Sequence, residues 1–162
     1  LVERIVTVGG DCVKNPANLR VRIGTPFSYA IEKCGGLTKN AEKIIMGGPM
    51  MGLAVSSLDV PIIKGTSGIL VFSKEMCAEH KKYPCLRCGK CVDGCPMHLL
   101  PNALKDAADK EDFETLERLN ISDCISCGSC TFICPAERNP LASIRTGKTK
   151  LNSHRKKEAE GR

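Results

Sequence analysis

The stretch Cys85-Leu86-Arg87-Cys88-Gly89-Lys90-Cys91-Val92-Asp93-Gly94-Cys95-Pro96 places four cysteines in the pattern Cys-x2-Cys-x2-Cys-x3-Cys-Pro. The same pattern returns in Cys124-Ile125-Ser126-Cys127-Gly128-Ser129-Cys130-Thr131-Phe132-Ile133-Cys134-Pro135. Gaps of two residues form a short loop, so the first three thiols of each run can converge on one site. The doubled pattern therefore predicts two sites built from thiolates.

Each run has the ligand spacing of bacterial two-cluster ferredoxins, in which three thiolates hold one [4Fe-4S] cube and the fourth reaches the other cube. Gly89, Gly94 and Gly128 have no Cβ atom and tolerate a positive φ, so the backbone can approach a cluster closely. Pro96 and Pro135 are expected in the first turn of a helix, where no N–H donor is needed. The pattern predicts a chain that carries electrons.

The three-residue gap should direct the fourth thiol of each run away from its own loop and toward the neighbouring site. Cluster I is therefore expected on Cys85, Cys88, Cys91 and Cys134. Cluster II is expected on Cys124, Cys127, Cys130 and Cys95. These eight thiolates are the predicted metal ligands, and we predict no catalytic residue.

Two other uses of cysteine are less consistent with the pattern. Structural zinc is bound by two separated Cys-x2-Cys pairs, and four thiols in one short run cannot all close on one ion without strain. A disulfide framework needs an oxidising compartment, but Leu1–Gly10 has no charged segment leading into an apolar one. Eleven cysteines without a secretory signal therefore indicate a reducing compartment.

Length and charge restrict the remaining possibilities. The chain has 162 residues, and its cysteine runs occupy only the second half, which favours two modules. The formal charge is +6, but two oxidised clusters at about −2 each would reduce it to roughly +2. This leaves little electrostatic case for nucleic acid. The longest apolar stretch, 44–55, is interrupted by glycines and a proline, so we expect no transmembrane segment.

Residues 1–72 are predicted to form a small α+β domain of the β-grasp type. Residues 4–8 and 19–23 alternate between apolar and polar side chains, as in a hairpin. Thr25 and Pro26 suit the N-cap and first position of a helix, and 43–46 and 69–72 read as further strands. A hairpin crossed by a helix, with further strands, is the arrangement that we expect.

The second half is predicted to be mainly α-helical. Residues 73–84 read as a charged connector, and 85–146 as a ferredoxin-type domain with both clusters. Within it, the insert 96–123 carries apolar residues at helical spacing, which predicts two helices over the clusters. Residues 147–162 read as a basic C-terminal tail. The overall fold class is α+β.

The order of several motifs resembles the C subunit of the Rnf electron-transport complexes. These motifs are 13–18 (Val-Lys-Asn-Pro-Ala-Asn), 23–26 (Ile-Gly-Thr-Pro), 47–52 (Gly-Gly-Pro-Met-Met-Gly), 64–70 (Lys-Gly-Thr-Ser-Gly-Ile-Leu) and the two cysteine runs. The resemblance implies a soluble-ligand-binding β-grasp (SLBB) domain followed by two [4Fe-4S] clusters. It also implies a bacterial complex that couples electron flow between ferredoxin and NAD to ion pumping.

The same resemblance implies partners and a location. The chain would lie peripherally at the cytoplasmic face of the bacterial inner membrane, with other subunits of the complex, including another iron–sulfur or flavin subunit. In this family FMN and NAD(H) bind upstream of the β-grasp segment, and residues 1–72 contain no glycine-rich phosphate loop after a strand. We therefore expect a C-terminal fragment that keeps the relay and lacks the flavin domain.

Two alternative functions remain open at this point. The chain also resembles the electron-transfer part of a cobalamin-reducing flavoprotein. As a different class, the β-grasp domain could bind a ligand while the clusters only support the fold. Cys12, Cys34 and Cys77 lie outside the runs and are expected to be ordinary buried or half-buried thiols.

The two cysteine runs differ in charge. Arg87 and Lys90 lie within the first run, where the second run has Ser126 and Ser129. Reduction adds a negative charge to a cluster, and nearby cations favour it. The sequence therefore predicts a higher reduction potential for cluster I than for cluster II.

Overall fold

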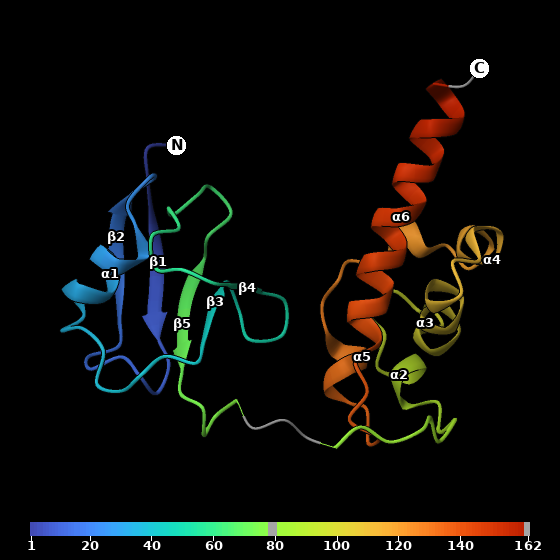
Figure 1. The fold of residues 1–162 in the computed structure, drawn as a ribbon, viewed down its shortest axis with the longest axis horizontal. Helices are drawn as coiled ribbons and strands as arrows, with labels where there is room; N and C mark the ends of the chain where they lie inside the picture. Colours follow the sequence, from blue (N-terminus) through green and yellow to red (C-terminus); the bar gives the residue numbers. More distant parts are fainter. Residues whose placement is uncertain (78–80, 161–162) are drawn as a thin grey trace. The chain divides into compact units, whose positions relative to one another are not determined.

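The computed structural model describes residues 1–77 and 81–160 (Figure 1). Contacts within the chain divide it into two compact units, Leu1–Glu79 and His80–Arg162, and each is described by itself. The first unit contains all the named strands, and the second is helical. The expected connector 73–84 falls partly outside the described residues.

The first unit is built on one five-stranded sheet in the order β2-β1-β5-β3-β4. β1 pairs antiparallel with β2 and parallel with β5, while β3 pairs antiparallel with both β5 and β4. The strands are β1 (Glu3–Gly9), β2 (Ala17–Arg22), β3 (Lys43–Met46), β4 (Leu53–Val55) and β5 (Gly68–Phe72).

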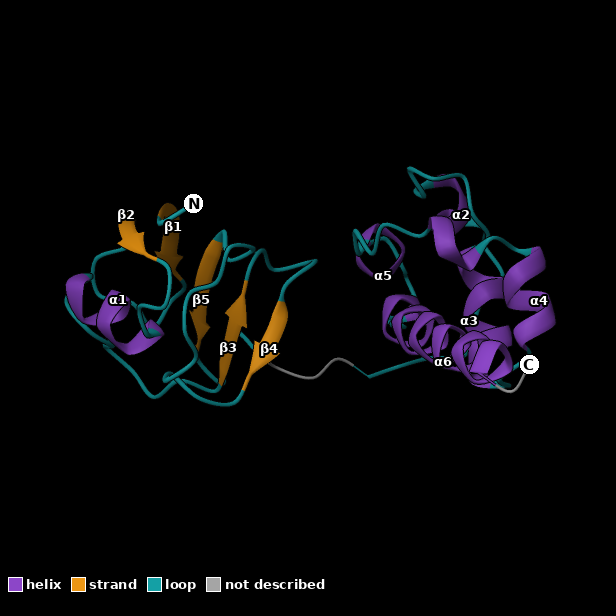
Figure 2. Cartoon of the chain, turned by 90° about the horizontal axis from the view of Figure 1, so that it is seen from above, coloured by secondary structure: helices purple, strands orange, loops and turns teal. Residues whose placement is uncertain are grey.

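The core of this unit lies between the sheet and helix α1 (Phe27–Lys33), which Figure 2 shows beside the sheet. Val6 and Val8 of β1 are fully buried, whereas Ile5, next to Val6, is 68% exposed, as expected for side chains that alternate along a strand. Phe27 of α1 and Val71 of β5 are also fully buried in this core. The predicted hairpin, helix and α+β class are confirmed.

The predicted helix cap at Thr25 is wrong. The N-cap of α1 is Pro26, and no side chain there accepts a hydrogen bond from the helix. Instead, the backbone N–H groups of Phe27 and Ser28 donate to the carbonyls of Val60 and Leu58, at 3.1 and 3.0 Å. Backbone carbonyls of a loop distant in sequence therefore accept the hydrogen bonds from the first N–H groups of α1. A capping Thr side chain would otherwise have this role.

The turn after β1 joins it tightly to β5. Gly10 has φ +109°, and a Cβ atom there would lie 2.0 Å from the carbonyl oxygen of Val71. Next to it, the Asp11 carboxylate accepts hydrogen bonds from the backbone N–H and hydroxyl of Ser73, which is 5% exposed. Both contacts fix the end of β5 against the end of β1.

Low pH should weaken the contact between the ends of β1 and β5 more in the wild-type protein than in an Asp11→Asn variant. Hydrogen bonds from the Ser73 hydroxyl and backbone N–H hold the pKa of Asp11 below its ordinary value of 3.8. A carboxyl whose pKa is lowered by folding stabilises the folded state fully at pH values above its ordinary pKa. This stabilisation is lost as the pH falls through the pKa that the carboxyl has in the folded protein. We expect hydrogen-exchange protection of β1 and β5 to decline below pH 3.8 in the wild type and to change less in Asp11→Asn. An identical decline in both proteins would contradict this role.

The second unit packs its helices around an apolar core of Leu99, Leu104, Ala107, Ala108, Leu116, Ile121, Ile144 and Leu151. Its helices are α2 (Lys90–Asp93), α3 (Pro101–Asp109), α4 (Phe113–Arg118), the 3-10 helix η1 (Ile121–Asp123), α5 (Ser129–Phe132) and α6 (Pro140–Glu160). The two helices expected in the insert are therefore α3 and α4.

Helices α3 and α6 approach closely at Gly147. A Cβ atom at this position would lie 2.7 Å from the Cβ atom of Ala108, so only glycine allows the observed separation. One turn further on, Leu151 is 1% exposed and belongs to the same core. Helix α6 therefore continues through residues 147–160, where we expected a separate basic tail.

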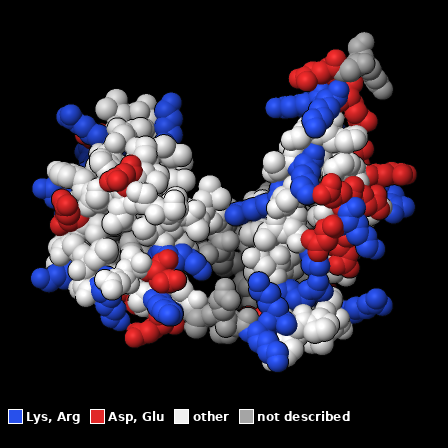
Figure 3. All heavy atoms as spheres, in the orientation of Figure 1, with Lys and Arg blue, Asp and Glu red and all other residues white. Residues whose placement is uncertain are grey.

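Two basic residues of α6 form ion pairs with acidic residues outside this helix. Lys150 Nζ lies 2.5 Å from Glu111 Oε1, and Arg155 Nε lies 2.7 Å from Glu117 Oε1. Figure 3 shows acidic side chains next to basic ones along this helix. Within 1–77 and 81–160, no helix combines the length and apolar character needed to cross a bilayer.

The second unit contains an internal repeat that extends beyond the cysteines. Arg87 and Ser126, at equivalent places in the two runs, have φ +52° and +56°, although neither is glycine. The next-but-one residues, Gly89 and Gly128, have φ +79° and +86° and precede α2 and α5. After each run the chain begins a longer helix with a proline, α3 and α6 respectively. The same backbone path is thus used twice.

Candidate metal centres

The first hollow of the second unit is lined by four cysteines from both runs. Cys85, Cys88 and Cys91 come from the first run, and Cys134 comes from the end of the second. The hollow has a volume of about 350 Å³, open solvent included. Its remaining lining residues are Leu86, Arg87, Gly89, Asn102, Pro135 and Ala136.

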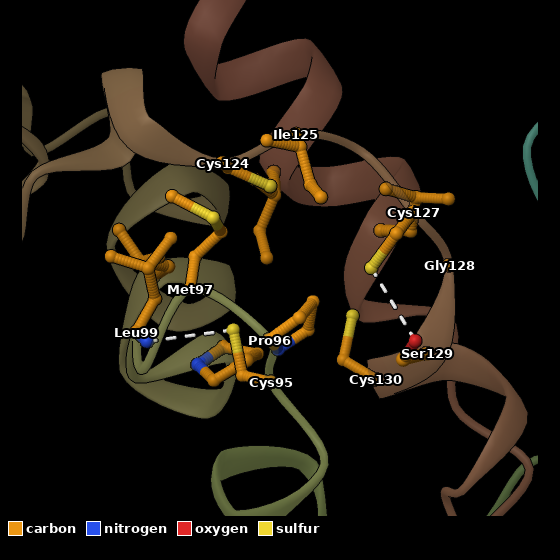
Figure 4. Close-up of a pocket in the computed structure, with 14 residues that line it drawn as sticks. Cys95, Pro96, Met97, Leu99, Cys124, Ile125, Cys127, Gly128, Ser129 and Cys130 are labelled. Carbon is orange, nitrogen blue, oxygen red and sulfur yellow. Dashed lines mark hydrogen bonds between the residues drawn. The ribbon is translucent and has the colours of Figure 1, made fainter.

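The second hollow has the reciprocal composition. Cys124, Cys127 and Cys130 come from the second run, and Cys95 comes from the end of the first. Figure 4 shows the sulfur atoms of these four residues around one common space, which has a volume of about 370 Å³, open solvent included. The structure thus brings together the same two sets of four thiols that the spacing predicted.

Local backbone geometry explains how each run presents its third and fourth thiols. The third cysteine, Cys91 or Cys130, lies on the short helix α2 or α5. The fourth, Cys95 or Cys134, follows the end of that helix, so our expectation that Pro96 and Pro135 lie in a first helical turn is wrong.

Helices α2 and α5 contact each other, and the residues that follow their ends pack closely. A Cβ atom at Gly94 would lie 3.3 Å from Cδ1 of Ile133, its counterpart in the repeat. Gly94 has an ordinary negative φ of −84°, unlike Gly89 and Gly128, so its role is close packing rather than a left-handed conformation. This contact keeps the two sites adjacent.

The arrangement of thiols fits a multi-atom group better than a single ion. A mononuclear zinc site needs every thiolate sulfur within about 2.3 Å of the metal. Four thiols spread around a hollow match the ligand set of a [4Fe-4S] cube, in which each sulfur binds a different iron.

The thiols differ in how easily they ionise. Burial raises the pKa of Cys130 to about 11, and burial also raises the pKa of Cys91. In contrast, the Ser129 hydroxyl, whose oxygen lies 3.4 Å from Cys127 Sγ, lowers the pKa of Cys127, together with the Ser129 backbone N–H. Because cluster ligands must be thiolates, cluster binding has to release protons from the buried thiols.

Helix α6 supplies two cations to the second run that the cysteine pattern did not reveal. Lys148 Nζ donates to the carbonyl oxygens of Ser122 and Cys124, at 2.8 and 3.0 Å. Arg145 donates to the carbonyl oxygen of Ser126 at 3.3 Å. Cations therefore lie near both runs, and the charge difference inferred from the two loops alone does not rank the sites.

Lys148→Met should loosen the second site selectively. Met keeps the apolar stem but removes the donor to two carbonyls of the ligand loop, and hydrogen bonds from charged groups contribute about 1.5–3 kcal/mol each. Since Lys148 is partly exposed, we expect roughly tenfold faster loss of one cluster to an iron chelator. The control is Lys150→Met on the same helix, which removes only the Glu111 pair. Equal rates in the two variants would contradict the prediction.

The other three cysteines do not line either hollow. Cys12 and Cys34 are 0% and 2% exposed in the first unit, and burial raises the pKa of both thiols. Cys77 is partly exposed. Cys12 and Cys34 therefore behave as protonated core residues.

Comparisons with known proteins agree with this division. Residues 5–54 match the SLBB domain family, and residues 77–135, which include all eight cysteines of the two runs, match the 4Fe-4S dicluster domain family. The chain is therefore an α+β iron–sulfur protein with an SLBB domain. The sheet extends beyond the matched SLBB segment, because β5 pairs with both β1 and β3.

Three curated relatives show which iron–sulfur proteins the chain is similar to. The chain is 45% identical over 146 residues to the C subunit of the proton-translocating ferredoxin:NAD(+) oxidoreductase complex of Clostridium ljungdahlii, covering 90% of this chain and 32% of that protein. It is 43% identical over 157 residues to the Na(+)-translocating counterpart of Acetobacterium woodii, covering 97% and 35%. The C subunit of the ion-translocating oxidoreductase complex of Rhodobacter capsulatus is 44% identical over 121 residues, covering 75% and 23%.

The chain is a homologue of the C subunits of Rnf complexes. It spans about a third of the length of the first two relatives.

Proposed function

We propose that the chain relays single electrons through two [4Fe-4S] clusters as part of the C subunit of an ion-translocating ferredoxin:NAD oxidoreductase. Cluster I would be held by Cys85, Cys88, Cys91 and Cys134, and cluster II by Cys124, Cys127, Cys130 and Cys95. The observation that carries the proposal is the reciprocal lining of the two hollows, each with three thiols of one run and one of the other.

A bound [4Fe-4S] cluster supplies one-electron redox chemistry, whereas nicotinamide accepts a hydride. The chain contributes the eight thiolates, of which Cys130 is buried while Cys85 and Cys88 are exposed. In each run the third and fourth cysteines serve different sites, and the direct packing of α2 on α5 keeps those sites close. Such a design suits transfer between the clusters.

The relatives' names support the wider context. They describe parts of complexes that translocate H⁺ or Na⁺ and connect ferredoxin with NAD(+). We propose that this chain works with other subunits of such a complex at the cytoplasmic face of the membrane, and that FMN and NAD(H) bind to an upstream domain of the same protein.

Anaerobic reconstitution followed by redox titration tests the proposal. We expect about eight irons and eight acid-labile sulfides per chain, and reversible one-electron reduction by dithionite. About two zinc ions per chain without visible absorbance would contradict the cluster assignment. Eight irons that cannot be reduced and reoxidised would instead favour the alternative in which the clusters only support the fold.

A further inference from the structure

The first hollow is lined by a residue with one buried polar atom that lacks a hydrogen-bond partner among the described residues. Asn102 lines this hollow with the four thiols, and its amide oxygen is buried without a hydrogen-bond partner in the part of the chain that the structure describes. A buried polar atom left unpaired costs about 1–3 kcal/mol, so such an atom calls for an explanation. A group that fills the hollow provides one.

Helix α3 holds Asn102 in place. The residue follows Pro101 at the start of this helix, and Pro101 is buried. The backbone N–H of Asn102 hydrogen-bonds the Cys91 thiol, which partly offsets the effect of burial on that thiol. A half turn of the side-chain amide exchanges its oxygen for its NH2 group, which carries two donors. Asn102 can therefore present an N–H donor from the same buried position.

The repeat supplies a natural comparison at the second hollow. The equivalent residue is Leu141, which follows Pro140 at the start of α6 and lines the second hollow. Its backbone N–H donates to the Thr131 hydroxyl at 3.2 Å rather than to a cysteine. The same place in the repeat thus offers an amide to one site and an aliphatic side chain to the other.

We propose that the side-chain amide of Asn102 donates a hydrogen bond to a sulfur of cluster I and raises the reduction potential of that cluster. The proposal rests on the cluster assignment above. Reduction places more negative charge on the sulfurs, and a donor directed at a sulfur therefore stabilises the reduced state more than the oxidised state.

Redox titration of the cluster-loaded chain, monitored by EPR, tests this role. In Asn102→Leu we expect the ratio of reduced to oxidised cluster I to fall about tenfold at a fixed potential, which corresponds to about 59 mV for a one-electron couple. Asn102→Asp keeps the size of the side chain but removes the donors, and it should shift the same potential at least as far. Leu141→Met is the matched control and should leave the cluster I potential unchanged.

A further variant shows which measured reduction potential belongs to which cluster. Ser129→Ala removes the hydroxyl beside Cys127 and should move only the cluster II potential. If both Asn102 variants load eight irons but leave both potentials in place, or shift the Ser129-sensitive one, the role of Asn102 is refuted while the relay stands. If the wild-type chain fails to load eight irons or to titrate reversibly, the proposed function itself is refuted.

Discussion

The double variant Cys88→Ala/Cys134→Ala should retain about four irons, whereas Cys88→Ala/Cys95→Ala should retain far fewer. In the crossed arrangement, Cys88 and Cys134 serve cluster I, so the first variant removes two ligands from one cluster and leaves the other intact. Cys95 serves cluster II, so the second variant damages both. Iron and acid-labile sulfide per chain, measured after anaerobic reconstitution, give the result.

This comparison needs no assignment of spectroscopic signals to sites. Both variants lose two thiols, so a general effect of cysteine removal would reduce both by the same amount. Cys34→Ala provides a further control outside the hollows and should retain about eight irons. If Cys88→Ala/Cys95→Ala instead retained four irons and the other variant lost them, each run would hold its own cube.

Gly10→Ala should destabilise the first unit by about 2–4 kcal/mol. The added Cβ atom would lie 2.0 Å from the Val71 carbonyl oxygen, and the residue would also have to keep φ +109°. Because Gly10 follows β1 and lies against the end of β5, the change should reduce hydrogen-exchange protection in both strands.

A Gly24→Ala variant separates the cost of a positive φ from the cost of the steric contact with Val71. Gly24 has φ +94°, but nothing lies within 4 Å of a Cβ atom placed there, so this variant carries only the cost of the backbone conformation, about 1 kcal/mol. We expect both variants to bind about eight irons, since the thiols lie in the other unit. Equal loss of protection in the two variants would mean that the contact with Val71 adds nothing.

Features encoded by short-range patterns could be predicted from the sequence. The spacing of the cysteines grouped the thiols as the hollows do, because loop length decides which thiols of a run can face the same site. Alternation placed β1 and β2, and apolar spacing placed α3 and α4. Alternation and apolar spacing act within one strand or a few helical turns, whereas the exchange of the fourth thiols was predicted from the ligand pattern of two-cluster ferredoxins.

Features that depend on distant contacts were missed. Strand β4 has only three residues between glycine-rich and polar segments, and its partner β3 gives it its conformation. The part of α6 from residue 147 onward carries so many charges that we predicted a tail there, although Leu141, Ile144, Gly147 and Leu151 lie on the buried side of this helix. The helical spacing of these four residues could have predicted a buried face. Gly147 has no apolar side chain, so the pattern was harder to recognise.

The shared ligands also fix when the sites can be completed during synthesis. The ribosome makes Cys85, Cys88, Cys91 and Cys95 first, but three of them wait for Cys134 and the fourth waits for the second run. The second set is complete once Cys130 has left the ribosome, and the first set once Cys134 follows, four residues later. In the crossed arrangement, iron–sulfur insertion is therefore a late event, and a chain that stops before Cys130 carries no complete site at all.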